Sequence, residues 1–437
     1  MEKSPFLDFV ERYPKYGQGL STLRMKQGFE RLKSRHVTKF PPVIHVVGSN
    51  GKGSTCHILE AALGYLGLRV GMFTSPHYYA FNERFRIGGA NVSDEALAVS
   101  IDTVSDIADR LAGIGGFEVM TLIAADLFLR EPLDVLVIEA GVGGRFDATR
   151  AFGGSVGVLT SVDLEHTEIL GESLEAIIAD KLDIVSPGGV VFTGWVDDAA
   201  LAFGEAHASE SQRRLIDVSK VTRLSYEADG EIRVSTEIGT APLEMTWCPV
   251  TPVDYLPRNA VLGLHAVEAL ALTDVASRDL ADAFTHAMNT ARLIGRFETL
   301  SDAPPTICDF AHTPAAAREV VASCERLFKG RRVIGVVGIS FDKNHVEMLG
   351  TFAEAWGEFL VFSARHKGLE AARLEAQIME INPRASVQVF DDIGELVECV
   401  KAEADDEAVF IVTGGIFSVM EFRSAFLGIP LASLKFF

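Results

Sequence analysis

The sequence is poor in cysteine and in long apolar runs, and both absences exclude classes of protein. Its five cysteines are odd in number, scattered and free of C-x-x-C spacing. This pattern argues against a disulfide framework or a zinc site and favours a reducing compartment. No stretch approaches the roughly 20 apolar residues that cross a bilayer, and residues 1–17 do not resemble a signal peptide. We therefore expect a cytoplasmic protein without a membrane partner.

Positive charge is also scarce. The chain has 40 Lys and Arg against 60 Asp and Glu, a formal net charge of −20. Such a negative net charge disfavours nucleic acid as a partner. An anionic substrate must therefore be bound by a local positive site. The chain is rich in core material instead, because 48% of its 437 residues are hydrophobic. This length predicts two domains.

Short apolar runs alternate with helical patterns along most of the chain. Such alternation is typical of mostly parallel sheets with helices on both faces. Between residues 218 and 250, strand-like alternation without helices predicts a small antiparallel addition. Helices are expected near residues 20–34, 93–112, 117–130, 173–185, 258–273 and 278–290.

We therefore expect an α/β protein made of two doubly wound domains. The larger N-terminal domain, residues 1–294, would be P-loop ATPase-like and would carry the antiparallel addition. The smaller C-terminal domain, residues 295–437, would be Rossmann-like and of usual domain size. Residues 292–300 are the candidate linker.

A glycine-rich segment follows the apolar run 43–47 and opens a helical pattern. Glycines let backbone N–H groups turn toward phosphate oxygens, and the start of a helix adds partial positive charge. Lys52 would reach the β- and γ-phosphates, and a hydroxyl of Ser54 or Thr55 can bind Mg²⁺. The spacing departs from the standard phosphate loop, but a ligand-free turn would not need a lysine. The predicted ATP-binding loop contains Gly48, Asn50, Gly51, Lys52, Gly53, Ser54 and Thr55.

Gly51-Lys52-Gly53-Ser54 in this setting resembles the Mur ligase superfamily, and further blocks narrow the likeness. Together they resemble folylpolyglutamate synthases and dihydrofolate synthases over nearly the whole chain. The resemblance implies a magnesium-dependent acid–amino-acid ligase that uses ATP to convert a carboxylate into an acyl phosphate and joins it to L-glutamate. The further blocks are residues 74–77 with 81–84, 139–145 with 147–149, 163–167 with 170–171, 309–314, and 412–415.

The resemblance also implies how two Mg²⁺ ions are held. Ser75 and the loop hydroxyl, taken as Ser54, would hold the first ion, while Glu139 and His166 would hold the second. Glu139 is independently a hard oxygen donor at the end of an apolar run, where ligands of open α/β sheets collect. A lone histidine such as His166 would otherwise be a surface or core residue.

Lys181 lies in a segment where related ligases often carry a carbamylated lysine, an anionic metal ligand. The ordinary alternative is a solvated lysine on a helix. The resemblance favours the modified residue and places it in the catalytic machinery. The residues expected to act in catalysis are Lys52, His166 and Lys181.

The remaining site residues are implied by the same likeness. Asn259 would contact the nucleotide base, although it could also cap its own helix. Arg296 would reach the ATP phosphates when the domains close, and Asp309 and His312 would face the nucleotide from the second domain. The alternatives are that Arg296 is an ordinary surface arginine and that Asp309 is a strand-end carboxylate without a ligand. The pterin-side loop would contact substrate through His77, Phe81 and Arg84.

Four blocks depart from the family pattern. Thr313 replaces the usual Asn, Ser340-Phe341 replaces Leu-Lys, and residues 145–147 and 415–417 also carry substitutions. None removes a metal or phosphate ligand, so these departures bear on the acceptor or the incoming amino acid. The acceptor could be dihydropteroate, a folate, or both.

Three other functions compete with a folate ligase. A Mur-type ligase of another pathway would use a non-folate carboxylate. An ATP- or GTP-binding switch or transport ATPase predicts a Walker B Asp, which the Glu139 block replaces. A nucleotide-binding module without activity would not need the full ligand set. We expect a monomer whose partners are small molecules: ATP, L-glutamate, and a folate or dihydropteroate.

Overall fold

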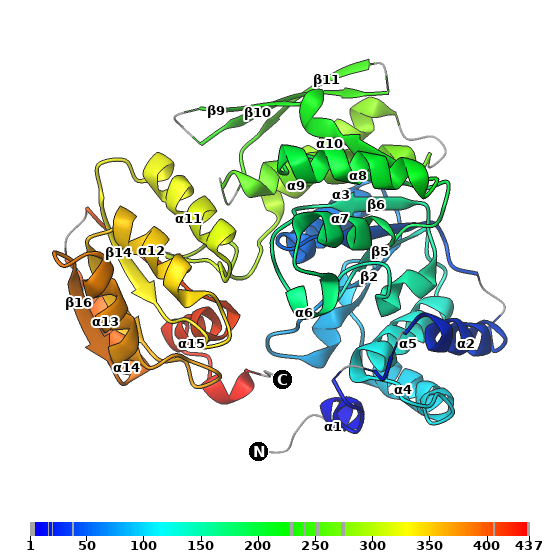
Figure 1. Cartoon of the computed structure of the whole chain (residues 1–437), viewed down its shortest axis with the longest axis horizontal. Helices are drawn as coiled ribbons and strands as arrows, with labels where there is room; N and C mark the ends of the chain where they lie inside the picture. The colour runs from blue at the N-terminus through cyan, green and yellow to red at the C-terminus, as the bar shows by residue number, and fades with distance from the viewer. Residues whose placement is uncertain are drawn as a thin grey trace. The chain divides into compact units, whose positions relative to one another are not determined.

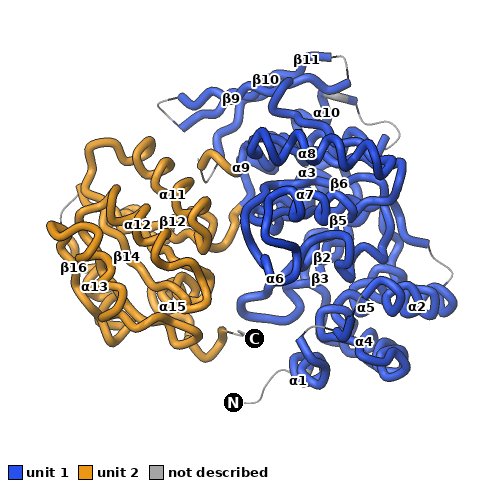
Figure 2. Tube along the Cα trace, in the orientation of Figure 1, with its two compact units in different colours: residues 1–250, 256–291 blue, residues 251–255, 292–437 orange. Residues whose placement is uncertain are grey.

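The computed structural model describes residues 5–15, 17–19, 21–36, 39–227, 230–239, 241–249, 251, 253–271, 276–404 and 407–434. The chain divides into two compact units (Figure 2). The first unit contains residues 1–250 and 256–291, and the second contains residues 251–255 and 292–437. Each unit is built on its own mostly parallel sheet with helices (Figure 1), which confirms the predicted fold class.

The first unit has an eight-stranded sheet in the order β4-β3-β2-β5-β1-β6-β7-β8. In this sheet order, the strands from β2 through β5, β1, β6 and β7 to β8 are parallel to their neighbours. Strands β3 and β4 add an antiparallel hairpin at the other end of the order. Five strands (β1, β2, β5, β6 and β7) are buried along their whole length, as a sheet covered on both faces requires. The strands are β1 Val43–Val47, β2 Val70–Phe73, β3 Phe85–Ile87, β4 Ala90–Asn91, β5 Val135–Glu139, β6 Val156–Leu159, β7 Val190–Thr193 and β8 Arg214–Asp217.

Helices connect these strands, and side-chain caps fix where several of them begin. Ser93 and Ser173 each accept a hydrogen bond from the backbone N–H three residues on. Helix α4 ends at Ala108, before the predicted end at 112, because the chain tightens there into single turns. The helices are α1 Pro5–Glu11, α2 Thr22–Lys33, α3 Lys52–Tyr65, η1 Phe81–Arg84, α4 Asp94–Ala108, α5 Gly116–Leu129, η2 Ala148–Phe152, α6 Thr167–Leu170, α7 Leu174–Leu182, α8 Asp198–Glu210, η3 Val218–Lys220, α9 Tyr255–Ala269 and α10 Ser277–Thr290. Leu20, the first residue of the predicted 20–34 helix, lies outside the described residues.

The predicted antiparallel addition is present as a three-stranded sheet. Its strands are β9 Arg223–Tyr226, β10 Ile232–Ile238 and β11 Ala241–Trp247, in the order β11-β10-β9. The Thr236 hydroxyl forms hydrogen bonds with Thr222 Oγ1 at 2.8 Å and with Nε2 of His265, on α9, at 3.2 Å. This buried polar chain ties the small sheet to the helix beneath it.

The second unit has a six-stranded sheet in the order β12-β13-β17-β14-β15-β16. Only β12 is antiparallel to its neighbour. Since β12 begins at Glu298, the last three residues of the predicted linker 292–300 belong to an edge strand. The elements are β12 Glu298–Asp302, β13 Pro305–Cys308, α11 Pro314–Leu327, β14 Arg332–Val337, α12 His345–Ala355, β15 Glu358–Phe362, α13 Ala371–Ile381, β16 Ser386–Phe390, α14 Ile393–Lys401, β17 Ala408–Thr413, α15 Ile416–Phe426 and η4 Leu431–Ser433. In the described part of the chain, no helix is both long and apolar enough to span a bilayer.

Buried histidines of the first unit, His45 and His265 among them, make its stability depend on pH. Burial lowers the pKa of His45 to about 4 and that of His265 to about 4, from an ordinary value of 6.5. In the unfolded chain these two histidines bind protons below pH 6.5, whereas in the folded chain they stay neutral until about pH 4. Stability is full above pH 6.5 and falls across this window, by about 3 kcal/mol for each histidine.

Denaturant unfolding measured from pH 7.5 to pH 4.5 should show this loss. His265→Gln removes one titrating group and should flatten the slope by up to about 1.4 kcal/mol per pH unit. The control is His286→Gln, a change at an exposed histidine of the same unit. Equal slopes in the parent and His265→Gln would contradict the assignment.

Candidate active site

Four loops of the first unit meet at one edge of the sheet. Strands β2, β5, β1 and β6 are parallel neighbours, and their last residues lie in register: Phe73 pairs with Ile138, Val46 with Glu139, and Val47 with Leu159. Their carboxyl ends therefore adjoin. In open α/β sheets, ligands bind at this edge.

The glycine-rich loop after β1 has the geometry of a phosphate cradle. Gly48 and Gly51 have φ angles of 148° and 84°, which disfavour any side chain, and a Cβ at Gly48 would collide with the Thr160 hydroxyl. Helix α3 begins directly after the loop, at Lys52. The Lys52 ammonium group donates to the carbonyl oxygens of Gly48 at 2.7 Å and Ser49 at 3.3 Å. The cation thus lies over the loop that would hold phosphate.

The segment after β6 braces this loop. The backbone N–H of Asn50 donates to Ser161 Oγ at 2.8 Å, and its side-chain amide donates to Asp163 at 2.8 Å. The Thr160 hydroxyl donates to the carbonyl oxygen of Asn50. The Asn50 side chain thus positions the loop, and its direct contact with a nucleotide stays a prediction. Asp163 was not predicted as a site residue, although it stands in the block at 163–167.

The two loop hydroxyls have different environments. Thr55 Oγ1 donates to the carbonyl oxygen of Gly51 at 2.9 Å. Ser54 Oγ is buried, and nothing in the described ranges forms a hydrogen bond with it. A buried hydroxyl without a partner is costly unless a ligand completes it. Ser54 is therefore the better candidate for a metal ligand.

Glu139 ends β5 and lies against the phosphate loop. It is 4% exposed, and its Oε2 accepts the backbone N–H of Ser75 at 2.9 Å. Gly53 leaves open the space in front of it, since a Cβ there would lie 3.6 Å from Oε2. A hydroxyl and a carboxylate are hard oxygen donors that suit Mg²⁺. In the described part of the chain, no three His, Cys, Asp or Glu side chains converge as a metal site.

We expect Ser54→Ala to raise the Mg²⁺ concentration needed for activity by about tenfold or more, because it removes one oxygen ligand. Thr55→Val removes a hydroxyl that is already committed to Gly51, so its Mg²⁺ requirement should shift less. The measurement is ADP release against Mg²⁺ concentration for both variants. A larger shift for Thr55→Val would show that the wrong hydroxyl was chosen.

Lys181 is not a solvated helical lysine. It lies on α7, is 1% exposed, and its Nζ pairs with Glu165 Oε1 at 2.9 Å. Burial lowers the Lys181 pKa, and the nearby Lys52 cation lowers it further, while Glu165 opposes the shift. Lys181 therefore stands within electrostatic reach of the phosphate loop. Glu165 is a site residue that the sequence did not single out, because its role depends on packing against α7.

His166 occupies an exposed position. It precedes α6 and adopts a left-handed backbone conformation with φ of 45°, which is unusual for a side chain of this size. The neighbouring Leu164 and Ile169 are 62% and 60% exposed. A strained, exposed loop is typical of functional segments, but the metal-binding role of His166 stays a prediction.

The three residues predicted to contact substrate lie together and are all buried. Arg84 Nε donates to His77 Nδ1 at 2.8 Å, and both side chains pack on the Phe81 ring. Burial and the Arg84 charge lower the pKa of His77 to about 3, so its ring is neutral. Phe81 also packs on Phe85, with ring centroids 5.4 Å apart. These three side chains therefore also form part of the hydrophobic core, which the sequence motif alone does not reveal. Their contact with substrate stays a prediction.

Asn259, in the first turns of α9, lies against the phosphate loop. It is 5% exposed, and a Cβ at Gly51 would come within 2.5 Å of its amide nitrogen. Only glycine therefore leaves room for the Asn259 amide at this point of the loop. The structure brings the predicted base-contacting residue to the predicted phosphate loop.

In the second unit, Asp309 holds the start of the domain together. The buried carboxylate accepts hydrogen bonds from the Tyr255 hydroxyl at 2.9 Å and from the backbone N–H groups of Phe297 at 3.0 Å and Ala311 at 2.8 Å. The Arg296 guanidinium lies 5.3 Å from the centre of the Phe310 ring. His312 Nδ1 lies 3.0 Å from the Phe310 carbonyl oxygen. Asp309 therefore has a structural role, and the nucleotide contacts of Arg296, Asp309 and His312 stay predictions.

Two further acidic residues shape the glycine-rich block after β5. Asp147 accepts the N–H groups of Gly141 and Val142 at 2.9 Å, and Asp180 accepts that of Gly144 at 2.7 Å. Neither was predicted as a site residue. An acidic side chain near a run of glycines is the sequence signal that could have indicated this bracing.

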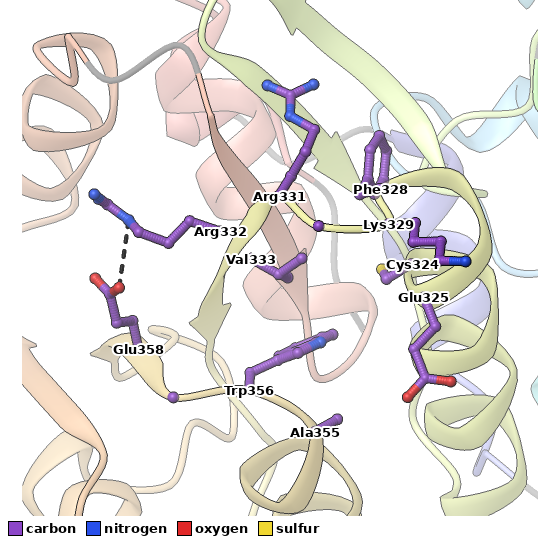
Figure 3. A pocket seen from close by; sticks show the side chains of 12 residues that line it. Cys324, Glu325, Phe328, Lys329, Arg331, Arg332, Val333, Ala355, Trp356 and Glu358 are labelled. Atoms are coloured by element: carbon purple, nitrogen blue, oxygen red, sulfur yellow. Dashed lines mark ion pairs between the residues drawn. The ribbon is translucent and has the colours of Figure 1, made fainter.

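The second unit has a cavity of about 400 Å³ that none of its predicted site residues lines. Figure 3 shows the residues that line it. It lies at the starting ends of β14 and β15, where Arg332 pairs with Glu358 at 3.3 Å. Lys329 and Trp356 also line it. The predicted residues follow the carboxyl end of β13, at the opposite edge of the sheet. The cavity therefore gives no support to a nucleotide site.

Comparison with known proteins identifies the family. The model of the Mur ligase glutamate ligase domain matches residues 295–416. A dihydrofolate synthase/folylpolyglutamate synthase of Escherichia coli is 30% identical over 382 residues, covering 87% of this chain and 85% of that protein. A probable bifunctional folylpolyglutamate synthase/dihydropteroate synthase of Halobacterium salinarum is 31% identical over 88% of this chain. The chain spans about half of that relative, 47% of its length.

Solved structures agree with the sequence relatives. E. coli FolC in complex with DHPP and ADP aligns with a TM-score of 0.81 and 28% identity, covering 97% of this chain and 98% of that one. A bifunctional folylpolyglutamate synthase/dihydrofolate synthase with Mn, AMPPNP and L-glutamate bound aligns with a TM-score of 0.80 and 29% identity, covering 97% and 98%. The chain belongs to the dihydrofolate synthase/folylpolyglutamate synthase family of Mur ligases.

Proposed function

We propose that this protein is an ATP-dependent amide ligase that phosphorylates a substrate carboxylate to an acyl phosphate and joins it to L-glutamate. The observation that carries the proposal is the edge of the first sheet. Neighbouring elements of that edge carry the polar groups of the site. These groups are the Lys52 cation, the buried Ser54 hydroxyl, the Glu139 carboxylate and the buried Lys181–Glu165 pair. The relatives' bound ADP, AMPPNP and L-glutamate support it.

The chemistry brings anions together, so neutralising charge is the main task. Backbone N–H groups of the loop and the Lys52 ammonium would bind the ATP phosphates. The substrate carboxylate attacks the γ-phosphorus, and ADP leaves. The neutral amine of L-glutamate then attacks the acyl carbon, a proton is lost from nitrogen, and phosphate leaves.

Divalent metal fits the donors present. Ser54 and Glu139 offer a hydroxyl and a carboxylate, and we propose that Ser75 and His166 complete two Mg²⁺ sites. Bound Mg²⁺ would neutralise phosphate charge and orient the oxygens for in-line transfer. The Mn in one relative supports use of a divalent ion.

We further propose that Lys181 is carbamylated in the active protein. Carbamylation needs the neutral amine, and burial favours that form by lowering the Lys181 pKa. We expect a carbamate signal after incubation with ¹³C-bicarbonate, detected by NMR, that Lys181→Ala abolishes. Lys329→Ala, a change at an exposed lysine, should retain the signal. A signal of equal size in Lys181→Ala would contradict the modification.

The acceptor is a dihydropteroate, a folate, or both. The bound DHPP of the E. coli relative and the names of the relatives support this class. To test it, the protein is incubated with ATP, Mg²⁺ and L-glutamate, and dihydropteroate or tetrahydrofolate is added in turn. We expect ADP and a product one glutamate heavier with at least one acceptor. No glutamate-dependent ADP and no such product with either would sink the folate assignment.

The alternative is a Mur-type amino-acid ligase that uses a non-folate carboxylate. The substitutions at Thr313 and in the Ser340-Phe341 block leave room for it, because they spare the phosphate and metal residues. Such an enzyme would bind ADP and respond to Lys52→Ala yet ignore both folate acceptors. A monomeric state, a cytoplasmic location and the lack of a nucleic-acid partner stay predictions.

A further inference from the structure

Lys181 is held in place by its neighbour on α7 as well as by its own ion pair. Its Nζ pairs with Glu165 at 2.9 Å, and the side chain is 1% exposed. Consecutive side chains of a helix point about 100° apart, so Asp180 faces a different part of the unit from the one that Lys181 faces. That part is residues 141–145, the glycine-rich block after β5.

The Asp180 carboxylate binds this block directly. Its Oδ2 accepts the backbone N–H of Gly144 at 2.7 Å. Gly143, with a φ of 70°, leaves room for the carboxylate, because a Cβ there would overlap Oδ2. The Asp180 carbonyl oxygen accepts the backbone N–H of Arg145 at 2.9 Å. One residue of α7 therefore binds two consecutive N–H groups of the block, through its side chain and its main chain.

Gly144 also packs on the backbone of Lys181. A Cβ at Gly144 would lie 2.9 Å from the Lys181 Cα and 2.7 Å from the Lys181 carbonyl oxygen. Side chains do not approach other atoms so closely, so only glycine allows this contact. Beyond Lys181, the Asp183 carboxylate accepts a hydrogen bond from Arg145 Nε at 2.7 Å. The block thus contacts α7 before, at and after Lys181.

The other end of the block is fixed beside the predicted metal site. The block follows Glu139, the last residue of β5, by one residue. Asp147 accepts the backbone N–H of Gly141 at 2.9 Å, which holds the start of the block. Because both ends of the block are held, its length sets the separation between Glu139 and Lys181.

We propose that Asp180 is a positioning residue for the reaction. Its hydrogen bond to Gly144 latches α7 to the glycine-rich block and so keeps Lys181 within electrostatic reach of the phosphate loop. This inference rests on the proposed function, because it takes Lys181 to act in carboxylate activation. It gives Asp180 no contact with substrate, since Asp180 acts through Lys181.

The test uses two variants that break the latch and two that keep it. Asp180→Ala removes the hydrogen-bond acceptor, and Gly144→Ala adds a methyl group that the Lys181 backbone excludes. Asp180→Asn keeps an oxygen that can accept the Gly144 N–H and loses only the charge. Asp197→Ala is the matched control, because the Asp197 carboxylate also accepts backbone N–H groups, two of them at the start of α8.

The first measurement follows the Lys181 amine and needs no catalysis. The folded proteins are treated with sulfosuccinimidyl acetate in bicarbonate-free buffer, and mass spectrometry gives the acetylation rate of Lys181. We expect a rate about tenfold above that of the parent in Asp180→Ala and Gly144→Ala, because local opening of α7 exposes the buried amine. Asp180→Asn and Asp197→Ala should react at the parent rate. Equal rates in Asp180→Ala and Asp197→Ala would overturn the latch.

The second measurement is a double-mutant cycle on ligation. Asp180→Ala should lower kcat about tenfold and leave the KM for ATP unchanged, because a misplaced group slows the reaction while the phosphate loop stays intact. In a Lys181→Ala background, Asp180→Ala should cause no further loss, because the residue through which it acts is gone. A merely structural Asp180 would lower kcat by the same factor in both backgrounds, and that result would overturn the proposal.

The remaining outcomes separate this proposal from the proposed function. Parent-like kcat in Asp180→Ala would overturn the positioning role, and parent-like kcat in Lys181→Ala would refute the catalytic role of Lys181 and the role of Asp180 with it. A parent protein without glutamate-dependent ADP release would refute the proposed function and any role of Asp180 in the reaction. The acetylation rates distinguish that failure from failure of the latch, since they do not depend on activity.

Discussion

Replacing Lys52 with alanine should reduce ATP-dependent glutamate ligation about a thousandfold while the protein stays folded. The Lys52 ammonium lies over the loop carbonyls of Gly48 and Ser49, so bound phosphate would draw it into direct contact. Removing one preorganised charge from a phosphoryl-transfer site costs two to three orders of magnitude or more. The measurement is acceptor-dependent ADP release at saturating glutamate.

The fold should tolerate this change because Lys52 gains little stability from its loop contacts. Two hydrogen bonds to carbonyl oxygens contribute about 1–3 kcal/mol in total. Lys220→Ala is the control, since this lysine is 62% exposed and pairs with the exposed Glu205 at 3.1 Å. A fully active Lys52→Ala would refute the phosphate role, and an unfolded variant would make the lysine structural.

Glu139→Gln should reduce activity by about a hundredfold or more and raise the Mg²⁺ concentration that the reaction needs. Glutamine keeps an oxygen that can accept the Ser75 N–H, so the local geometry survives while the negative charge is lost. A neutral amide is a far weaker ligand for Mg²⁺ than a carboxylate. Activity is measured across a Mg²⁺ series, with melting temperature as the check on folding.

A matched control exists on the same sheet. Glu131 lies just before β5, is 39% exposed and pairs with Arg69 at the surface. Glu131→Gln should leave both the rate and the Mg²⁺ dependence unchanged. If Glu139→Gln shows the Mg²⁺ response of the parent, Glu139 positions the Ser75 loop and does not bind metal.

The core of the fold could be predicted because local sequence carries it. Runs such as residues 43–47 and 135–139 are almost entirely apolar and are bounded by glycine or polar residues, so buried strands are the natural prediction for them. The strands at the two edges of the first sheet were not predicted, for the opposite reason. Strand β8, residues 214–217, is half-exposed and polar, and the hairpin of β3 and β4 is too short to show a period. Pairing with a neighbour, which a local pattern does not contain, creates these strands.

The site was predictable where one segment carries the chemistry. Lys52 stands in its own motif, and Glu139 ends a buried strand, so the local sequence is enough to indicate both. Glu165 and the burial of Lys181 depend on how α7 packs beside the β6 loop.

Transfer of oxygen from the acceptor to phosphate tests the central claim most directly. The accepted pteroate or folate is labelled with ¹⁸O in its reacting carboxylate, and the reaction is run with ATP, Mg²⁺ and L-glutamate. If an acyl phosphate forms, one labelled oxygen must leave with each phosphate released, and mass spectrometry of the phosphate will show one ¹⁸O per molecule. Unlabelled phosphate formed together with the glutamylated product would contradict carboxylate activation by phosphoryl transfer.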